Sequence, residues 1–214
     1  MKYKNIIWDW NGTILNDAPI AFEATNLLLQ RFGYPTITFE YYRDNVDTPI
    51  VNFYSKIFDL NRHDMEMLDD EWGILYNQLS DKIDLHTGVE EILCSFADKK
   101  LKQIILSAFK TKEITKYASK FSVEQYFDDI LGTENIVMES KKDRGIRYMQ
   151  EHGFAPNQTL YIGDTVHDYE TARGLGADCI LFSGGQQSPK LLKRCGVPVY
   201  DTFADIMKDL SGGI

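Results

Sequence analysis

The sequence predicts an α/β fold, a doubly wound parallel sheet with an inserted α-helical segment. From Gly88 onward, short apolar runs alternate with helical segments of about ten residues, the pattern of parallel strands joined by helices. Before Gly88, one apolar run, Ile6-Ile7-Trp8, precedes roughly seventy residues with helical periodicity. Because an isolated apolar strand cannot satisfy its backbone hydrogen bonds, this first run is expected to join the same sheet.

The inserted segment is expected to be helical throughout. Apolar residues at three- and four-residue spacing run from Ile20 to Phe32, and Gly33 ends that pattern. Segments near residues 38–59 and 64–81 have helical periodicity without strand-like alternation. Two units are therefore expected, a core of residues 1–15 and 84–214 and a helical cap of residues 16–83.

The rest of the core is expected to alternate between helix and strand. Helices are predicted at residues 89–99, 112–121, 142–152 and 168–175. Strands are predicted at residues 103–107, 127–131, 160–162 and 179–182. Open α/β sheets bind their ligands beyond the carboxyl ends of the strands, so polar side chains at those ends are the candidate functional residues.

Composition narrows the possible functions. The 214 residues suffice for one α/β domain with an inserted subdomain. The chain has 23 Lys and Arg against 32 Asp and Glu, a formal charge of −9, and no segment concentrates basic residues. Nucleic acid is therefore not an expected partner.

Cysteine spacing and hydropathy indicate the cellular compartment. Cys94, Cys179 and Cys195 have neither the spacing of a zinc site nor that of a disulfide framework, so reduced thiols are expected. The chain enters its first strand without an apolar stretch of signal-peptide length, and no run approaches a transmembrane span. We expect a soluble cytoplasmic protein without a membrane partner.

Chemically useful side chains gather at the predicted strand ends. They are Asp9, which ends the first strand, Ser107, which ends the second, Asp164 and Asp168, which follow a later one, and Lys141 and Lys142, which precede a helix. Carboxylate oxygens at such an edge can hold Mg²⁺, which binds substrate phosphate. A hydroxyl and an ammonium group can hold the remaining phosphate oxygens. The sequence therefore predicts a Mg²⁺-assisted phosphoryl-transfer site.

Two motifs carry a family resemblance. They are Asp9-Trp10-Asn11-Gly12-Thr13 and Gly163-Asp164-Thr165-Val166-His167-Asp168. In order and spacing they resemble motifs of the haloacid-dehalogenase-like (HAD) hydrolase superfamily, whose core is a Rossmann-type sheet. The resemblance covers nearly the whole chain, and the position of the cap resembles the phosphoglycolate-phosphatase-like branch.

The resemblance implies a nucleophile and a metal site. Asp9 would be the nucleophile that takes the phosphoryl group as an aspartyl-phosphate. Asn11 would offer its backbone carbonyl to Mg²⁺. Asp164 would bind the metal directly, and Asp168 would act directly or through water. The implied substrate is a small phosphorylated molecule.

The resemblance also implies a phosphate site. Ser107 would bind phosphate, and Lys141 would pair with both phosphate and Asp9. Lys142 stands where the family often has proline, and the choice between the two lysines stays open. Gly12 and Thr13 would complete the site. Gly12 has no Cβ, which lets a phosphate oxygen approach backbone donors.

Asn11 departs from the family motif, which has a second Asp at this position. That Asp protonates the leaving oxygen and later deprotonates the attacking water, and an amide does neither. General acid–base assistance is typically worth about a hundred- to ten-thousandfold in rate. The missing carboxylate therefore leaves three interpretations.

The first is a phosphatase that is slow, prefers good leaving groups, or uses another proton carrier such as His167 or a cap residue. The second is a phosphonate hydrolase of the phosphonoacetaldehyde type, for which Lys56 would be the Schiff-base lysine. The third is a non-catalytic module that binds metal and phosphate. We favour the first, because the nucleophile and every other phosphate-handling group are present together.

The substrate and the oligomeric state stay open. Phosphoglycolate, a sugar phosphate and a nucleotide are all compatible with the motifs. Arg43, Lys56, Arg62 and His63 are cap residues that could face substrate or solvent. The segment Gly184–Ser188 could be a substrate-side loop or a plain turn.

Overall fold

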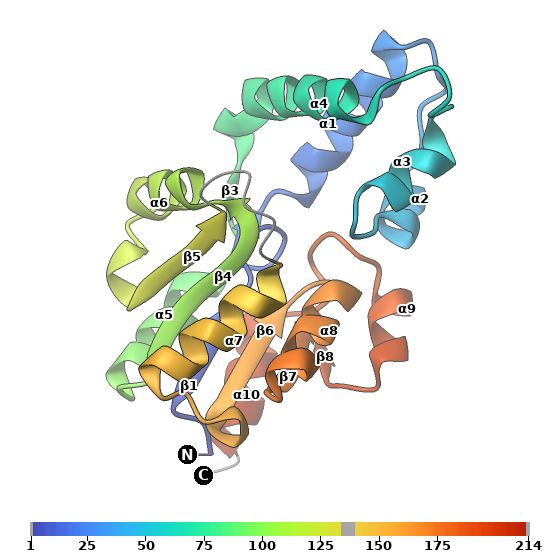
Figure 1. Cartoon of the computed structure of the whole chain (residues 1–214). Helices are drawn as coiled ribbons and strands as arrows, with labels where there is room; N and C mark the ends of the chain where they lie inside the picture. The colour runs from blue at the N-terminus through green and yellow to red at the C-terminus, as the bar shows by residue number, and fades with distance from the viewer. Residues whose placement is uncertain (1, 134–139, 213–214) are drawn as a thin grey trace.

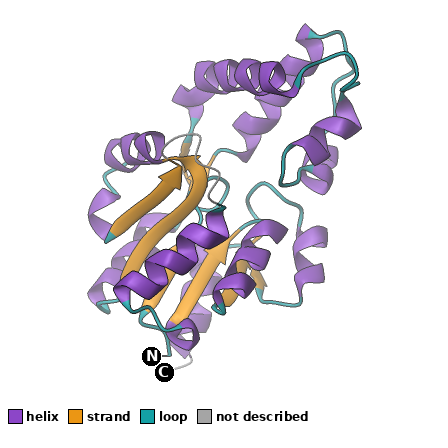
Figure 2. Cartoon of the chain, in the orientation of Figure 1, coloured by secondary structure: helices purple, strands orange, loops and turns teal. Residues whose placement is uncertain are grey.

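A computed structural model describes residues 2–133 and 140–212 of the chain (Figure 1). Its core is a six-stranded sheet, in the order β5-β4-β1-β6-β7-β8, in which all neighbouring strands are parallel. The strands are β1 (Asn5–Trp8), β4 (Lys102–Lys110), β5 (Asp129–Thr133), β6 (Thr159–Gly163), β7 (Asp178–Phe182) and β8 (Val199–Tyr200). Helices cover both faces, as Figure 2 shows, and the predicted doubly wound fold is confirmed.

The core helices are α5 (Val89–Asp98), α6 (Thr111–Lys120), α7 (Lys141–His152), α8 (Val166–Leu175), α9 (Pro189–Leu192) and α10 (Phe203–Gly212). Short 3₁₀ turns occupy Ser80–Lys82, Glu124–Tyr126, Pro156–Gln158 and Lys193–Cys195. In the described residues, no helix combines the length and the apolar character that crossing a membrane requires.

The central strand β1 is buried on both faces, which explains its continuous apolar run. Ile6 and Trp8 pack into the cluster that includes α5, α6 and α10, whereas Ile7 packs into the cluster that includes α7, α8 and α9. Trp8 also donates from Nε1 to Gln103 Oε1 at 3.1 Å, and Gln103 Nε2 donates to the Leu93 carbonyl at 3.0 Å. Side chains thereby tie β1 to β4 and to helix α5.

Some element bounds differ from the sequence prediction. Strand β4 continues to Lys110, so the prediction that Ser107 ends it is wrong. The reason is a register shift between Leu106 and Lys110, after which Lys110 pairs with Thr133 of β5. Helix α7 begins at Lys141 because the side chain of Ser140 accepts a hydrogen bond from the Asp143 amide as its N-cap. Strand β8 and helix α10 follow the last predicted strand and extend the sheet.

Between β1 and β4 the chain leaves the sheet to form a helical insertion, which consists of four helices. They are α1 (Ala18–Arg31), α2 (Phe39–Asn45), α3 (Val51–Ile57) and α4 (Met65–Leu79). The chain enters through β2 (Leu15–Asn16) and returns through β3 (Asp84–Leu85), and these two short strands pair antiparallel. Helices α2 and α3 are separate because Pro49 lies between them, and the residue before a proline is disfavoured in a helix.

We predict that Trp8→Phe destabilises the core. The change leaves Gln103 Oε1 buried without its donor, which alone is expected to lower the free energy of unfolding by about 1–3 kcal/mol. Denaturant unfolding followed by circular dichroism measures this loss. The double variant Trp8→Phe with Gln103→Met removes both partners and should recover part of it, whereas unchanged stability of the single variant would contradict the importance of this hydrogen bond.

Candidate active site

The loop after β1 forms a tight turn around Gly12. Gly12 has a φ of +79°, a left-handed conformation, and its amide donates to the Leu15 carbonyl at 2.9 Å. A Cβ at this position would lie 2.2 Å from Asp164 Oδ2, so only glycine fits. The turn brings the Thr13 hydroxyl to 2.8 Å from Asp164 Oδ1 and 3.3 Å from Asp9 Oδ2.

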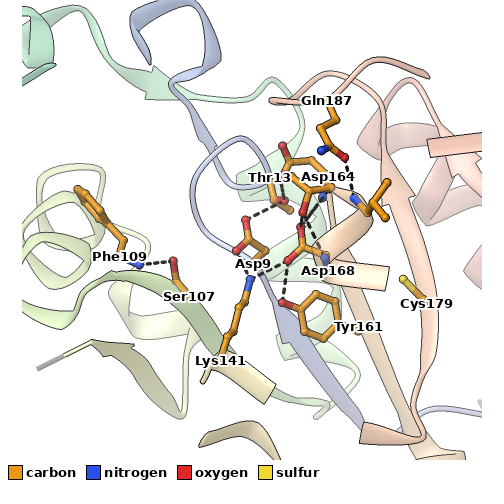
Figure 3. Close-up of polar contacts among 12 residues, drawn as sticks. Asp9, Thr13, Ser107, Phe109, Lys141, Tyr161, Asp164, Asp168, Cys179 and Gln187 are labelled. Carbon is orange, nitrogen blue, oxygen red and sulfur yellow. Dashed lines mark hydrogen bonds and ion pairs between the residues drawn. The ribbon is translucent and has the colours of Figure 1, made fainter. Parts of the chain in front are cut away.

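Three buried carboxylates meet at the carboxyl edge of the sheet. Asp9 follows β1, while Asp164 follows the neighbouring strand β6 and Asp168 lies in the first turn of α8. A carboxylate oxygen from each of the three lies within 4.8 Å of the others (Figure 3). The structure therefore brings together the three acidic residues that the motifs predicted.

Lys141 is the cation of this cluster. Its Nζ lies 2.5 Å from Asp9 Oδ1 and 2.7 Å from Asp168 Oδ1, and its side chain is buried (Figure 3). Lys142 is exposed and its side chain lies against Gly174. The geometry thus favours Lys141 over Lys142 as the lysine of this site.

Asp168 is held by protein donors on both of its oxygens. Oδ1 accepts from Lys141 and, at 3.0 Å, from the Tyr161 hydroxyl. Oδ2 accepts from the Asp164 amide and from both the amide and the hydroxyl of Thr165. Thr165 and Asp168 form a capping box at the start of α8, so the helix start itself orients this carboxylate.

Burial and mutual repulsion shift the pKa values of these carboxylates. Burial, together with the charge of Asp168, raises the pKa of Asp9 to about 7 against the opposing effect of Lys141. Burial and the charges of Asp9 and Asp168 raise the pKa of Asp164 well above its ordinary value. Burial also acts on Asp168, but the charge and hydrogen bond of Lys141 outweigh it and keep the pKa of Asp168 below the ordinary value.

The donor set fits a hard divalent cation. Three carboxylates and one ammonium group give a net charge of −2 when all are ionised, and their buried oxygens face one another. Mg²⁺ prefers oxygen ligands and is usually bound through one or two carboxylates plus water and phosphate. Asp9 and Asp164 fit direct ligation better than Asp168: among the described residues each of them accepts two hydrogen bonds, whereas Asp168 accepts five.

Ser107 is less directly connected to the carboxylates. Its hydroxyl oxygen accepts from the Phe109 amide at 3.1 Å. In the view of Figure 3, Ser107 lies to the left of Asp9 and Lys141, whereas Asp164 and Asp168 lie to the right. Among the described residues Ser107 forms no hydrogen bond with Asp9 or Lys141. Its carbonyl accepts from Arg144 Nη2 at 2.6 Å, so α7 contacts the same bulge of β4.

The side chain of Asn11 turns toward Asp17 rather than toward the three carboxylates. Asn11 Nδ2 donates to Asp17 Oδ2 at 2.7 Å, and the Gly12 amide donates to Asp17 Oδ1 at 2.7 Å. Asp17 is buried, and the sequence reasoning did not select it. The available signal was an additional carboxylate a few residues after the first motif.

The segment Gly184–Ser188 lies against the site and is more than a plain turn. The Gln186 amide donates to Asp164 Oδ2 at 2.6 Å. Gln187 Oε1 accepts from the Val166 amide at the start of α8, at 2.7 Å. A Cβ on Gly185 would lie 2.1 Å from Asp164 Oδ2, so this glycine lets the segment approach the carboxylate.

Within the described residues, no hydrogen bond or ion pair joins the basic residues suggested in the insertion to the three carboxylates. Arg43 Nη2 donates to the carbonyls of Ser183 and Gln187 and so joins α2 to the segment before α9. Lys56 is exposed and donates to the Asn45 carbonyl, which does not suggest a Schiff-base lysine.

The other suggested residues are Arg62 and His63 of the insertion and His167 of α8. Arg62 pairs with Asp59, and His63 Nε2 lies 3.1 Å from the Tyr34 hydroxyl. His167 is half-buried, and burial lowers its pKa.

Comparison with known families shows to which family the chain belongs. The family model of the haloacid dehalogenase-like hydrolases matches residues 6–182. The chain belongs to this family. The match begins in β1, includes both motifs, and ends with β7, so the carboxylates and Lys141 all lie within it.

Curated relatives of this hydrolase are similar along most of their length. A phosphoglycolate phosphatase of Aliivibrio fischeri is 23% identical over 219 residues, covering 96% of this chain and 92% of the relative. A phosphoglycolate phosphatase of Vibrio parahaemolyticus is 24% identical, covering 81% and 80%.

Solved structures share the fold of the hydrolase. A haloacid dehalogenase-like family hydrolase from Streptococcus pneumoniae superposes with a TM-score of 0.85 at 17% identity, covering 98% of this chain and 99% of that one. A predicted phosphatase from Clostridium acetobutylicum gives 0.82 at 18% identity, covering 99% and 100%. These two structures thus share the fold of both the core and the helical insertion.

We predict that the metal-free hydrolase loses stability as the pH rises. The pKa of Asp9 is about 7 in the folded state and 3.8 in the reference state. The contribution of Asp9 to the free energy of unfolding is therefore fully present below pH 3.8, and it is lost as the pH rises to about 7. The melting temperature in chelator should fall between about pH 4 and about pH 7, and Asp9→Asn should flatten that fall. An equal fall in Asp9→Asn would assign the effect to other groups.

Proposed function

We propose that this hydrolase is a Mg²⁺-dependent phosphatase that acts on a small phosphorylated metabolite through an aspartyl-phosphate intermediate. The observation that carries the proposal is the position of Asp9: it directly follows the central strand, and its carboxylate contacts Lys141 and Thr13 and lies within 4.8 Å of Asp164 and Asp168. The named relatives add support, since they are phosphoglycolate phosphatases. A phosphoglycolate-like substrate is therefore the first candidate.

Residues 1–15 and 84–214 would supply the chemistry, and residues 16–83 would act as the cap. The strands β2 and β3 join the two parts. Side chains of the insertion reach the catalytic edge, since Tyr42 donates to Gln186 Oε1 at 2.8 Å. A cap over the site would exclude water from the first chemical step, as lids commonly do in phosphoryl transfer.

In the first step an Asp9 oxygen would attack phosphorus. The new Asp9–phosphorus bond forms as the bond to the leaving oxygen breaks, and the leaving group departs as an anion that takes a proton once it reaches solvent. Bound Mg²⁺ would lower the negative charge that the phosphoryl oxygens present to Asp9. Lys141, the Thr13 hydroxyl and Ser107 would hold phosphoryl oxygens, which concentrates positive charge where negative charge develops.

In the second step water would attack the phosphorus of the aspartyl-phosphate. The Asp9–phosphorus bond then breaks, Asp9 regains its carboxylate, and inorganic phosphate leaves with both protons of the water. Asn11 has no proton to exchange in either step, and its side chain is bonded to Asp17. Both the protonation of the leaving group and the activation of water are therefore expected to be unassisted by this residue.

We predict that Asp9→Asn abolishes Mg²⁺-dependent phosphate release while the fold remains. The amide conserves volume but removes the nucleophile. A panel of phosphomonoesters, assayed with Mg²⁺ and with chelator, measures turnover, and circular dichroism checks the fold. Near-wild-type turnover in Asp9→Asn would exclude the covalent route.

Asp164→Asn is the matched variant for the metal site. Removal of one carboxylate charge should weaken Mg²⁺ binding first, so a large part of the activity should return at high Mg²⁺. Unchanged metal dependence would place Asp164 outside the ligand set.

We predict a steep dependence on the leaving group. Without an acid at position 11, aryl and acyl phosphates should be cleaved about a hundredfold or more faster than alkyl phosphates. A burst of leaving group should precede the steady state, because unassisted hydrolysis lets the aspartyl-phosphate accumulate. Equal rates for p-nitrophenyl phosphate and an alkyl phosphate, without a burst, would show that another residue carries the proton.

A further inference from the structure

Asp17 is a buried carboxylate that the proposed chemistry does not use. It lies between β2 and α1 and is 2% exposed. Burial raises its pKa. None of its hydrogen-bond partners within residues 2–133 and 140–212 is a cation. Such a group is costly to bury unless hydrogen bonds compensate for the lost water.

The position of Asp17 in the chain does not require this burial. Asp17 is the N-cap residue of α1, where an Asp side chain ordinarily accepts from amides of the first helical turn. Here the side chain makes no capping bond, although the Asp17 carbonyl accepts from the amides of Ile20 and Ala21 as an N-cap carbonyl ordinarily does. The carboxylate is turned away from its own helix and toward the loop after β1.

Hydrogen bonds from three separate parts of the molecule converge on this carboxylate. Oδ1 accepts from the Gly12 amide at 2.7 Å and from Gln186 Nε2 at 3.1 Å. Oδ2 accepts from Asn11 Nδ2 and from the Tyr76 hydroxyl of α4, both at 2.7 Å. Asp17 therefore joins the loop that carries Asn11 to the helical insertion and to the segment before α9.

The Gln186 contact extends the network to the carboxylate cluster. The Gln186 amide donates to Asp164, and its side chain links Asp17 to the Tyr42 hydroxyl of α2. Two tyrosines of the insertion, Tyr42 and Tyr76, thus reach the catalytic edge through one glutamine and one aspartate. A shift of the insertion would change the hydrogen bonds that position both Asn11 and Asp164.

We propose that Asp17 is a positioning residue that fixes the loop of Asn11 and Gly12 relative to Asp9, and that position 11 must carry a hydrogen-bond donor because Asp17 faces it. The proposal rests on the proposed phosphatase function for its kinetic readout. A carboxylate at position 11 would place two acidic groups at hydrogen-bond distance in a buried position, where none of the hydrogen-bond partners of Asp17 in the described residues is a cation. The amide in the motif is thus the partner of Asp17.

Exchange of the two side chains tests this pairing. The variants are Asn11→Asp, Asp17→Asn and the double exchange, each measured for melting temperature and for kcat and KM with p-nitrophenyl phosphate and Mg²⁺. Asn11→Asp supplies the carboxylate of the family motif, but it should nevertheless lower kcat about tenfold or more with little change in KM, because repulsion by Asp17 displaces the loop from Asp9. The double exchange restores one donor and one acceptor, and its kcat should exceed that of Asn11→Asp about tenfold.

The outcomes separate the pairing from the proposed function. A kcat of Asn11→Asp at or above wild type, or a double exchange no better than that variant, overturns the proposal. A lowered melting temperature with unchanged kcat reduces Asp17 to a structural role and overturns it as well. If the wild-type protein releases no phosphate, the proposed function fails, and recovery of the melting temperature in the double exchange still tests the pairing.

Tyr76→Phe tests the link to the insertion without altering a charge. It removes one donor to Asp17 and should lower kcat about two- to tenfold at similar KM. Tyr54→Phe is the matched control, because Tyr54 is another buried tyrosine of the insertion whose hydroxyl does not bond Asp17. Equal kinetics of the two variants would contradict the role of Asp17 as the connection between α4 and the loop.

Discussion

The burial of like charges at the carboxyl edge of β1 and β6 is the constraint on which the rest of the site depends. Asp9, Asp164 and Asp168 are buried together, and among the described residues Lys141 is the cation that pairs with two of them, Asp9 and Asp168. Such an arrangement persists only where hydrogen bonds hold each carboxylate in place. Thr13, Thr165 and Tyr161 provide these bonds together with backbone amides.

The backbone supplies what the side chains alone cannot. Parallel pairing of β1 with β6 sets Asp9 beside the loop that carries Asp164, and the capping box of α8 then orients Asp168. Gly12 and Gly185 both lie so close to Asp164 Oδ2 that neither position has room for a Cβ. Sheet register, a helix start and two close backbone approaches therefore determine the geometry of a few oxygen atoms.

Much of this could be predicted from the sequence because its signals are local. Apolar runs and helical periodicity indicate the core elements, and parallel topology then implies that residues at strand ends, such as Asp9 and Asp164, converge. Strand β8 has only two residues, too few for any alternation. The bulge after Leu106 depends on pairing with β5, so the sequence misplaced the strand end at Ser107.

The contacts of Asp17 and Gln186 were equally inaccessible to sequence reasoning. They depend on the approach of segments far apart in the chain, since residue 17 meets residues 76 and 186. An acidic residue before a helix predicts an ordinary cap, and the local pattern contains no sign that its side chain turns the other way. Position 11 alone could be recognised as unusual, without the partner that accounts for it.

Strands β2 and β3 carry a consequence for how such a chain diversifies. Leu15 pairs with Leu85 and Asn16 with Asp84, so the ends of the helical insertion are neighbours in space. A segment that leaves and re-enters a domain at adjacent points places little demand on the length or shape of what lies between them. The sheet can therefore stay intact while the length of the insertion changes, provided that donors equivalent to Tyr42 and Tyr76 still reach Gln186 and Asp17.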